Sequence, residues 1–266
     1  MAATTTTTKP LPSLLQQKIW DARLPLEIHL SRDESRQYTS TPPYLTSIPR
    51  LSYLPLLLPR LHRYFIPWLI ADAAAISPDE GYFTFDGIPL KWHFPIGLLY
   101  DISTPTGDAV IGINPSPVVL HDAFINSLKE ADFVRSGTAK PIMSLPTSES
   151  KSLWTSTQAN DLAIWAKVHG SLLPKPGQWR GIPLRIFLPV LNDDNDNDDN
   201  DDHDYNDDTK ALNSLLPSLF PSRRTAVLAR PILHGAPVPM SANLEDLARW
   251  CCYADGWVAV VVGVNG

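Results

Sequence analysis

Residues Val119–Gly137 read VLHDAFINSLKEADFVRSG, and this stretch predicts an amphipathic helix around which the rest of the chain can be arranged. Its apolar side chains recur at the 3.6-residue helical repeat and share one arc, formed by Leu120, Phe124, Leu128, Ala131 and Val134. Such an arc normally faces a hydrophobic core. Gly137 suits the residue that ends the helix. The stretch therefore predicts a helix whose buried face lies at the centre of a folded domain.

Lys129 lies nearly opposite the apolar arc, so its amine should stand in solvent. Ile125 and Phe133 lie four residues before and after it and should share its face, where a solvated helix normally carries polar side chains. Asp122 and Asp132 flank this face and would hold an ammonium group by hydrogen bonds. A lysine followed by acids is most often an ordinary surface residue. The large apolar neighbours instead favour a docking surface that presents Lys129.

Charge is distributed very unevenly along the chain. The 266 residues carry a formal charge of −6, but the run from Asn192 to Asp208 contains ten aspartates and no lysine or arginine. Without that run the charge would be +4, so the folded body is mildly basic. A mildly basic body can approach anionic membrane surfaces, which is a hint of peripheral membrane association. Nothing in this balance indicates nucleic-acid binding.

Cys251 and Cys252 are adjacent, and neighbouring Cα atoms lie about 3.8 Å apart, below the usual separation in a disulfide. Reduced thiols fit the cytosol. The sequence also shows no secretion signal and no apolar span of membrane length, so we expect a cytoplasmic protein. A catalytic cysteine is the alternative for this pair, but no histidine-bearing motif accompanies it.

The N-terminal part of the chain predicts strands around a helix. Ser13 to Trp20 suits a short helix, and a period-2 alternation from Leu24 to Leu30 predicts a half-buried strand. A second strand is expected from Tyr44 to Leu54, followed by a helix from Leu56 to Ile70 that its prolines make irregular. An alternation from Tyr82 to Gly87 then predicts a third strand, and its pair Asp86-Gly87 marks a tight turn.

After that turn we expect a returning strand from Leu90 to Phe94 and a helical turn from Pro95 to Tyr100. The order strand, strand, helix, strand, strand is that of a ubiquitin-like grasp. Its last strand is only weakly present, at Ala109 to Ile113. His29 and His93 stand alone on expected strands without a partner at metal spacing, so we predict no metal site.

Two further helices should follow the central one, at Ser148 to Gln158 and, capped by Asn160, at Asp161 to Leu173. They predict a small helical module. The C-terminal part then alternates between strands and helices, with expected strands at Leu184 to Leu188, Ala226 to Leu233 and Trp257 to Val264, and expected helices at Leu212 to Phe220 and Leu244 to Cys252. The last strand is almost wholly apolar and β-branched, which predicts a central strand covered by helices.

The acidic run imitates the first positions of a calcium-binding loop with Asp194, Asp196 and Asp198. Asp199 occupies the position that needs glycine and Tyr205 the position that needs a bidentate glutamate. Because the like charges also repel one another, we interpret the run as a disordered insertion.

Three separated motifs resemble the autophagy-related protein 5 family and occur in the expected order. They are SLKEAD around Lys129, FDGIPLKWHFPIGLLYD from Phe85 to Asp101, and ILHGAPVP from Ile232 to Pro239. The resemblance implies that Lys129 receives the C-terminal glycine of the ubiquitin-like autophagy-related protein 12 through an isopeptide bond. It also implies that the conjugate stimulates, like an E3 ligase, the transfer of autophagy-related protein 8 to phosphatidylethanolamine during autophagosome formation.

The resemblance implies an α+β fold in which two ubiquitin-like β-grasp folds flank a helix-rich module. We expect a tail at residues 1–12, a first ubiquitin-like domain with the N-terminal helix at 13–118, the helix-rich module at 119–174, and a second ubiquitin-like domain at 175–266 with the acidic insertion 192–208. The sequence offers no catalytic residues and no cofactor motif. We therefore expect a scaffold that is not itself an enzyme.

The resemblance further implies a non-covalent partner, the N-terminal helix of autophagy-related protein 16, and contact with the conjugating enzymes. It implies a place in the cytoplasm and, peripherally, at the preautophagosomal membrane. We expect the helix in a groove where the three modules meet, lined or supported by aromatic anchors near Trp20, Trp92 or Trp257. Two alternatives remain, namely a structural adaptor whose Lys129 is never modified and a hydrolase that uses Cys251 with a remote histidine.

Overall fold

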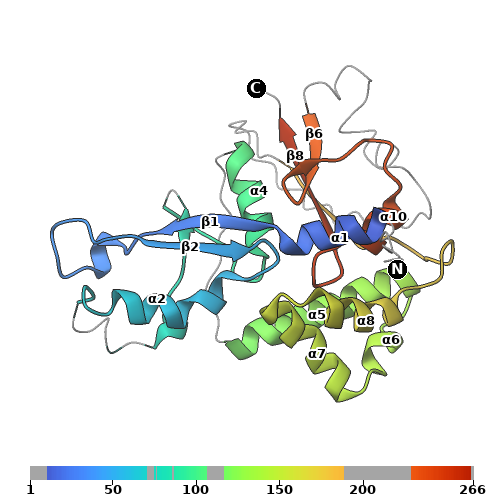
Figure 1. The fold of residues 1–266 in the computed structure, drawn as a ribbon, viewed down its shortest axis with the longest axis horizontal. Helices are drawn as coiled ribbons and strands as arrows, with labels where there is room; N and C mark the ends of the chain where they lie inside the picture. The colour runs from blue at the N-terminus through green and yellow to red at the C-terminus, as the bar shows by residue number, and fades with distance from the viewer. Residues whose placement is uncertain are drawn as a thin grey trace, which may run out of the picture.

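The computed structural model describes residues 11–70, 75, 77–85, 87–106, 117–188 and 229–264 of the chain. Within these ranges the fold is α+β, with separate sheets and a helical module (Figure 1). The expected tail and the expected weak strand at Ala109 to Ile113 lie wholly or mostly outside the described residues. The acidic run and the expected helix at Leu212 to Phe220 also lie outside them.

The chain begins with helix α1 (Leu11–Asp21), which leads into an antiparallel hairpin of β1 (Arg23–Ile28) and β2 (Tyr44–Pro49). The alternation of Leu24, Leu26 and Ile28 is confirmed, since these side chains are buried or half-buried while their neighbours are exposed. A 3-10 turn, η1 (Arg32–Glu34), lies in the connection between the strands.

The predicted helix from Leu56 to Ile70 is divided by its prolines. A 3-10 turn, η2 (Leu54–Leu57), precedes helix α2 (Leu58–Phe65), which has Pro59 near its start and ends before Pro67. Proline suits the first turn of a helix, where its missing N–H costs no hydrogen bond, but not the interior. Another 3-10 turn, η3 (Pro78–Glu80), follows.

The strand predicted from Leu90 to Phe94 is wrong. Strands β3 (Thr84–Phe85) and β4 (Ile88–Pro89) form a hairpin of two residue pairs, and the chain then turns, with Phe94 N–H donating to Lys91 O. Proline residues that lack an N–H flank this turn and end the ladder. Helix α4 (Ile96–Thr106) runs beyond the predicted Tyr100.

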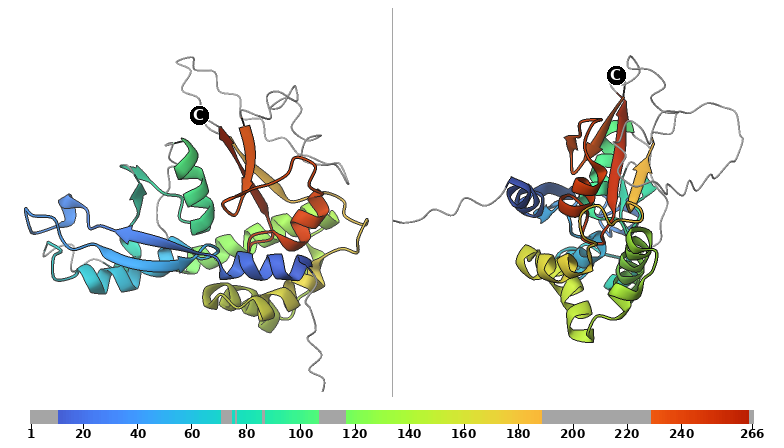
Figure 2. Two further views of the ribbon diagram at one scale, coloured as in Figure 1. Left: turned by 45° about the horizontal axis from the view of Figure 1, so that its top comes forward. Right: turned by 90° about the vertical axis from the view of Figure 1, so that its right-hand side faces the viewer.

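The helical module consists of α5 (Pro117–Ser136), α6 (Lys140–Met143), α7 (Thr147–Ala159) and α8 (Leu162–Leu172). Two views show these four helices packed together beneath the C-terminal sheet, while the β1–β2 hairpin and α2 extend to one side (Figures 1 and 2). Gly137 ends α5 with a φ of 72°, and its N–H donates to Phe133 O. The predicted helix stop is therefore confirmed.

The cap predicted for α8 is wrong by one residue. Asp161 is the cap, since its carboxylate accepts from Ile164 N–H at 3.1 Å. Asn160 instead ends α7 in the left-handed conformation, which asparagine tolerates better than most residues, and its side chain donates to Trp20 O at 2.9 Å. A residue between two helices can end the first or cap the second, and its backbone conformation determines which of the two it does.

The C-terminal sheet has the order β5-β8-β6-β7. Its strands are β5 (Leu184–Phe187), β6 (Ala229–Leu233), β7 (Ala236–Pro237) and β8 (Val258–Val264), and helix α10 (Leu244–Trp250) lies before β8. Strand β8 pairs in parallel with β5 and antiparallel with β6, so the predicted central strand is confirmed. Asn243 caps α10, since its side-chain oxygen accepts from Asp246 N–H at 3.1 Å.

The hydrophobic core runs through all three parts of the molecule. Trp20 of α1 lies at 5.1 Å from Trp165 of α8, measured between ring centroids, and Trp165 Nε1 donates to Ala254 O at 3.0 Å. Among the described helices, none is long and apolar enough to cross a bilayer. The three parts are thus joined by a shared interior, which holds α5 in a fixed place.

Candidate functional site

Helix α5 carries the candidate site on its outer side. Leu120, Phe124, Leu128 and Ala131 of the predicted apolar arc are all almost fully buried. Val134 is only half-buried, and the neighbouring Arg135 is fully buried instead. The arc is therefore confirmed except at its last position, where a polar cluster replaces the apolar contact.

The amine of Lys129 lies on the face opposite the arc. The side chain is half-buried, and Nζ donates to Asn126 Oδ1 over 3.4 Å. Phe133, one turn further on, leaves 59% of its surface exposed. Ile125, one turn before, is partly buried against the core, so the prediction of an exposed Ile125 is wrong. The exposed apolar surface beside Lys129 is therefore formed by Phe133.

The two flanking acids behave differently from the prediction. Asp122 is exposed as expected, but its carboxylate lies 3.3 Å from Nδ1 of His121. Asp132 is fully buried, which contradicts its predicted place beside the amine. No acid within the described ranges forms an ion pair with Lys129. The amine is thus held by a weak contact with an amide and not by carboxylates.

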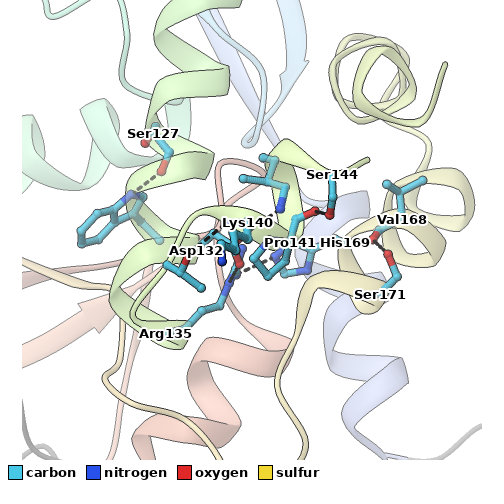
Figure 3. Close-up of polar contacts among 12 residues, drawn as sticks. Ser127, Asp132, Arg135, Lys140, Pro141, Ser144, Val168, His169 and Ser171 are labelled. Atoms are coloured by element: carbon cyan, nitrogen blue, oxygen red, sulfur yellow. Dashed lines mark hydrogen bonds and ion pairs between the residues drawn. The ribbon is translucent and has the colours of Figure 1, made fainter. Parts of the chain in front are cut away.

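Asp132 instead joins the helices of the module (Figure 3). Its carboxylate accepts from Arg135 Nε at 3.1 Å and from Ile142 N–H at 3.0 Å, which ties α6 to α5. Arg135 Nη1 also lies 3.3 Å from Nε2 of His169. Burial lowers the pKa of His169 well below its usual value, and the nearby Arg135 charge acts in the same direction. The neutral imidazole can therefore accept the hydrogen bond from Arg135.

The second ubiquitin-like part touches α5 through a cluster that we did not predict. Arg185 of β5 lies with its Cζ 4.0 Å from the ring centroid of Trp257 and its Nη2 3.3 Å from both Ser127 Oγ and Glu130 Oε2. Trp257 Nε1 donates to Ser127 O at 3.0 Å (Figure 3). Sequence periodicity gives no signal for such pairs, because their members lie more than 50 positions apart.

The three tryptophans proposed for a partner groove occupy different environments. Trp20 is 1% exposed and packs in the interior, so it can only support a groove from below. Trp92 is half-buried against the core. Trp257 is also half-buried, and its ring lies under the Arg185 guanidinium. The burial of these tryptophans does not identify a partner, so the groove stays a prediction.

Cys251 and Cys252 are free and buried. Burial, with a smaller effect of Asp246, raises the pKa of Cys251 to about 11. Burial also raises the pKa of Cys252 to about 12, although the nearby Arg135 charge opposes this. Since the thiolate is the nucleophile, these thiols are poorly suited to catalysis near neutral pH. Nδ1 and Nε2 of His234 are also occupied or buried, with Nε2 2.8 Å from Cys251 O. The geometry does not favour the hydrolase alternative.

Within the described ranges, no group of three or more histidine, cysteine, aspartate or glutamate side chains is placed to hold a metal ion. The site on α5 therefore consists of an amine, an exposed aromatic ring and a polar anchor to the second sheet. An amine presented in this way can form an amide bond with an activated carbonyl.

Comparison with known proteins gives this site its context. Three family models match in succession, described as "Autophagy protein ATG5, UblA domain" at residues 19–116, "alpha-helical bundle region" at 117–175 and "UblB domain" at 181–262. Together they span most of the chain. The chain belongs to the autophagy protein 5 family. It therefore contains two ubiquitin-like domains around a helical bundle and works in autophagy.

Curated relatives support the same assignment over nearly the full length. Autophagy protein 5 of Aspergillus fumigatus is 41% identical over 315 aligned positions that cover 96% of each chain. The Aspergillus terreus protein is 42% identical over 308 positions that cover 95% of this chain and 97% of its own. Because each alignment is longer than 266 residues, the relatives carry residues that this chain lacks.

A solved structure supports the fold. The crystal structure of Kluyveromyces marxianus Atg5 superposes with a TM-score of 0.75, covering 93% of this chain and 98% of that one. The two sequences are 19% identical, so the match concerns the fold alone. The α+β prediction with two ubiquitin-like parts is confirmed.

Proposed function

We propose that Lys129 is the acceptor of a ubiquitin-like protein, autophagy-related protein 12. In this step Nζ of the neutral amine attacks the thioester carbonyl between the modifier's C-terminal glycine and the cysteine of its conjugating enzyme. The C–S bond breaks, the thiol leaves with a proton, and an isopeptide bond forms. The step needs no catalytic residue from this chain, which acts as a scaffold and not as an enzyme.

The observation that carries this proposal is the placement of Lys129 on a buried and well-anchored helix. Its amine contacts only an amide oxygen at 3.4 Å among the interactions of the described residues, so no carboxylate has to be displaced before it reacts. The exposed ring of Phe133 lies on the same face and offers an apolar surface to an incoming protein. The SLKEAD motif surrounds this lysine.

The proposed conjugate acts as an E3-like stimulator. It favours transfer of autophagy-related protein 8 from its conjugating enzyme to phosphatidylethanolamine during autophagosome formation. This activity places the protein in the cytoplasm and peripherally at the preautophagosomal membrane. Membership of the family supports these steps, which need the conjugate and not the unmodified chain.

The test is to replace Lys129 with arginine and to compare it with Lys167→Arg, which changes an exposed lysine of α8 in the same bundle. Arginine keeps the charge but stays protonated and cannot attack a thioester. With purified modifier and conjugating enzymes, Lys129→Arg should abolish the conjugate, and Lys167→Arg should leave it intact. Both should change the free energy of unfolding by less than about 0.5 kcal/mol. A conjugate that persists in Lys129→Arg would contradict the proposal and favour an adaptor whose Lys129 is not modified.

A helical partner, autophagy-related protein 16, completes the proposed assembly. Three packed modules leave apolar seams that an amphipathic helix can fill. Trp92 and Trp257 are partly exposed and can report on such a helix, whereas Trp20 can respond only from the interior. Titration with the partner peptide should quench tryptophan fluorescence and raise the melting temperature. A melting temperature that stays unchanged at saturating peptide would contradict the predicted groove.

A further inference from the structure

The turn of α5 that carries Lys129 is attached to the second ubiquitin-like domain through Arg185. From β5, the Arg185 guanidinium reaches Ser127 Oγ and Glu130 Oε2, each at 3.3 Å from Nη2. Its Nη1 lies 3.6 Å from Asp255 Oδ2, and its plane lies against the Trp257 ring at 4.0 Å. Four groups, two on α5 and two in the loop before β8, thus converge on one side chain.

Two further bonds hold the same turn. Ser127 Oγ donates to Asp255 Oδ2 at 2.8 Å, and Trp257 Nε1 donates to Ser127 O at 3.0 Å. Asp255 is buried, so its carboxylate depends on these partners. Ser127 and Glu130 are separated by three positions and therefore share one side of the helix, while Lys129 points about 100° away from Glu130 and about 160° away from Ser127. Arg185 can fix the turn without touching the amine.

We propose that Arg185 is a positioning residue for conjugation at Lys129, which rests on the proposed function. It holds the Ser127–Glu130 turn against the second domain, so that the Lys129 amine meets the thioester carbonyl in a fixed orientation. Rates of such reactions depend steeply on the placement of the attacking atom. Binding of the conjugating enzyme does not require Arg185, because the side chain is directed toward α5 and Trp257.

The variants follow from the geometry. Arg185→Ala removes every contact of the guanidinium. Arg185→Lys keeps one charge but loses the planar group that reaches Ser127, Glu130 and Asp255 together. Arg249→Ala is the matched control, since Arg249 lies in the same domain and also contacts a carboxylate, a carbonyl and a tryptophan, namely Glu245, Pro174 and Trp179. None of these control contacts involves α5.

The experiment measures the steady-state kinetics of conjugation with the charged conjugating enzyme as the varied substrate. Arg185→Ala should lower kcat by about tenfold with KM changed by less than about twofold. Arg185→Lys should recover part of kcat, and Arg249→Ala should have the same kcat and KM as the parent protein. Amide hydrogen exchange should become faster across residues 126–131 in Arg185→Ala and not in Arg249→Ala.

The outcomes separate the two proposals. If Lys129 of the parent protein carries the modifier but Arg185→Ala keeps its kcat, or if Arg249→Ala loses as much, the positioning role is overturned and the proposed function stands. Unchanged exchange across 126–131 overturns the positioning role without any conjugation. Mass-spectrometric mapping of the parent conjugate to another lysine overturns both.

Discussion

Single residues at the ends of α5 show how local geometry fixes the site. Gly137 has a φ of 72°, a region that side chains with a Cβ atom rarely adopt. A Cβ at this position would also collide with the Arg180 side chain. Arg180 is held beside the helix end by its backbone N–H, which donates to Arg135 O at 2.8 Å. Glycine is therefore required twice at this position, by the backbone and by its neighbour.

We predict that Gly137→Ala destabilises the protein by about 1 kcal/mol or more, because alanine is strained at positive φ and lacks room. Gly170→Ala is the control, since Gly170 lies in α8 with ordinary φ and nothing within 4 Å of the added Cβ. That change should leave stability unchanged or raise it by up to about 1 kcal/mol. Urea unfolding measures both, and equal effects of the two changes would contradict the argument.

At the scale of elements, α5 owes its place to polar anchors as well as to its apolar arc. The buried pair of Asp132 and Arg135 joins α5 to α6 and α8, while Arg185 joins it to the second sheet. The burial of Asp132 also turns it away from Lys129. The acid that we expected beside the amine is instead part of a buried ion pair with Arg135.

We predict that Asp132→Ala costs about 3 kcal/mol, because it leaves the buried Arg135 without its carboxylate and Ile142 N–H without its acceptor. Asp122→Ala, nearly three helical turns earlier on the exposed face, should change stability by less than about 0.5 kcal/mol. Chemical denaturation of both variants tests the contrast. A small effect of Asp132→Ala would show that solvent reaches the pair.

At the scale of the whole molecule, buried polar groups join the two ubiquitin-like parts. Arg50 follows β2 and pairs with Asp101 of α4 at 2.5 Å, and the Gly235 turn of the second sheet lies against its guanidinium. Burial raises the pKa of Asp101 although Arg50 opposes this. His234, next in the chain to Gly235, donates from Nε2 to Cys251 O, and its ring centroid lies 4.2 Å from that of the tilted Tyr253 ring. The junction thus favours a neutral imidazole.

This arrangement predicts that the folded protein loses stability in acid. Burial lowers the pKa of His234 from 6.5 to about 4. As pH falls through this window the unfolded chain binds the proton first, so the free energy of unfolding decreases. His234→Asn should remove on the order of 2 kcal/mol of that loss between pH 7 and pH 4, since asparagine tolerates the φ of 53° and does not titrate. Unfolding at both pH values measures this, and an equal loss in the variant would contradict it.

The elements that depend on local pattern were predictable from the amino-acid sequence. The arc of α5, the alternation of β1, the central β8 and the stop at Gly137 follow from side-chain periodicity and backbone preference, which act over a few residues. The motifs were enough to indicate the family. They also singled out Lys129, whose role stays a proposal.

The partner of each polar side chain, in contrast, depends on how the helices and strands pack together. Helical spacing placed Asp132, Ile125 and Phe133 alike on or beside the exposed face, but packing of α6 buries Asp132 fully and the core buries Ile125 in part. Packing also brought Arg185 and Trp257 to a turn of α5 more than 50 residues away. The reason is physical: periodicity specifies the direction of a side chain from its own helix, whereas burial and hydrogen bonding depend on the element that packs against it.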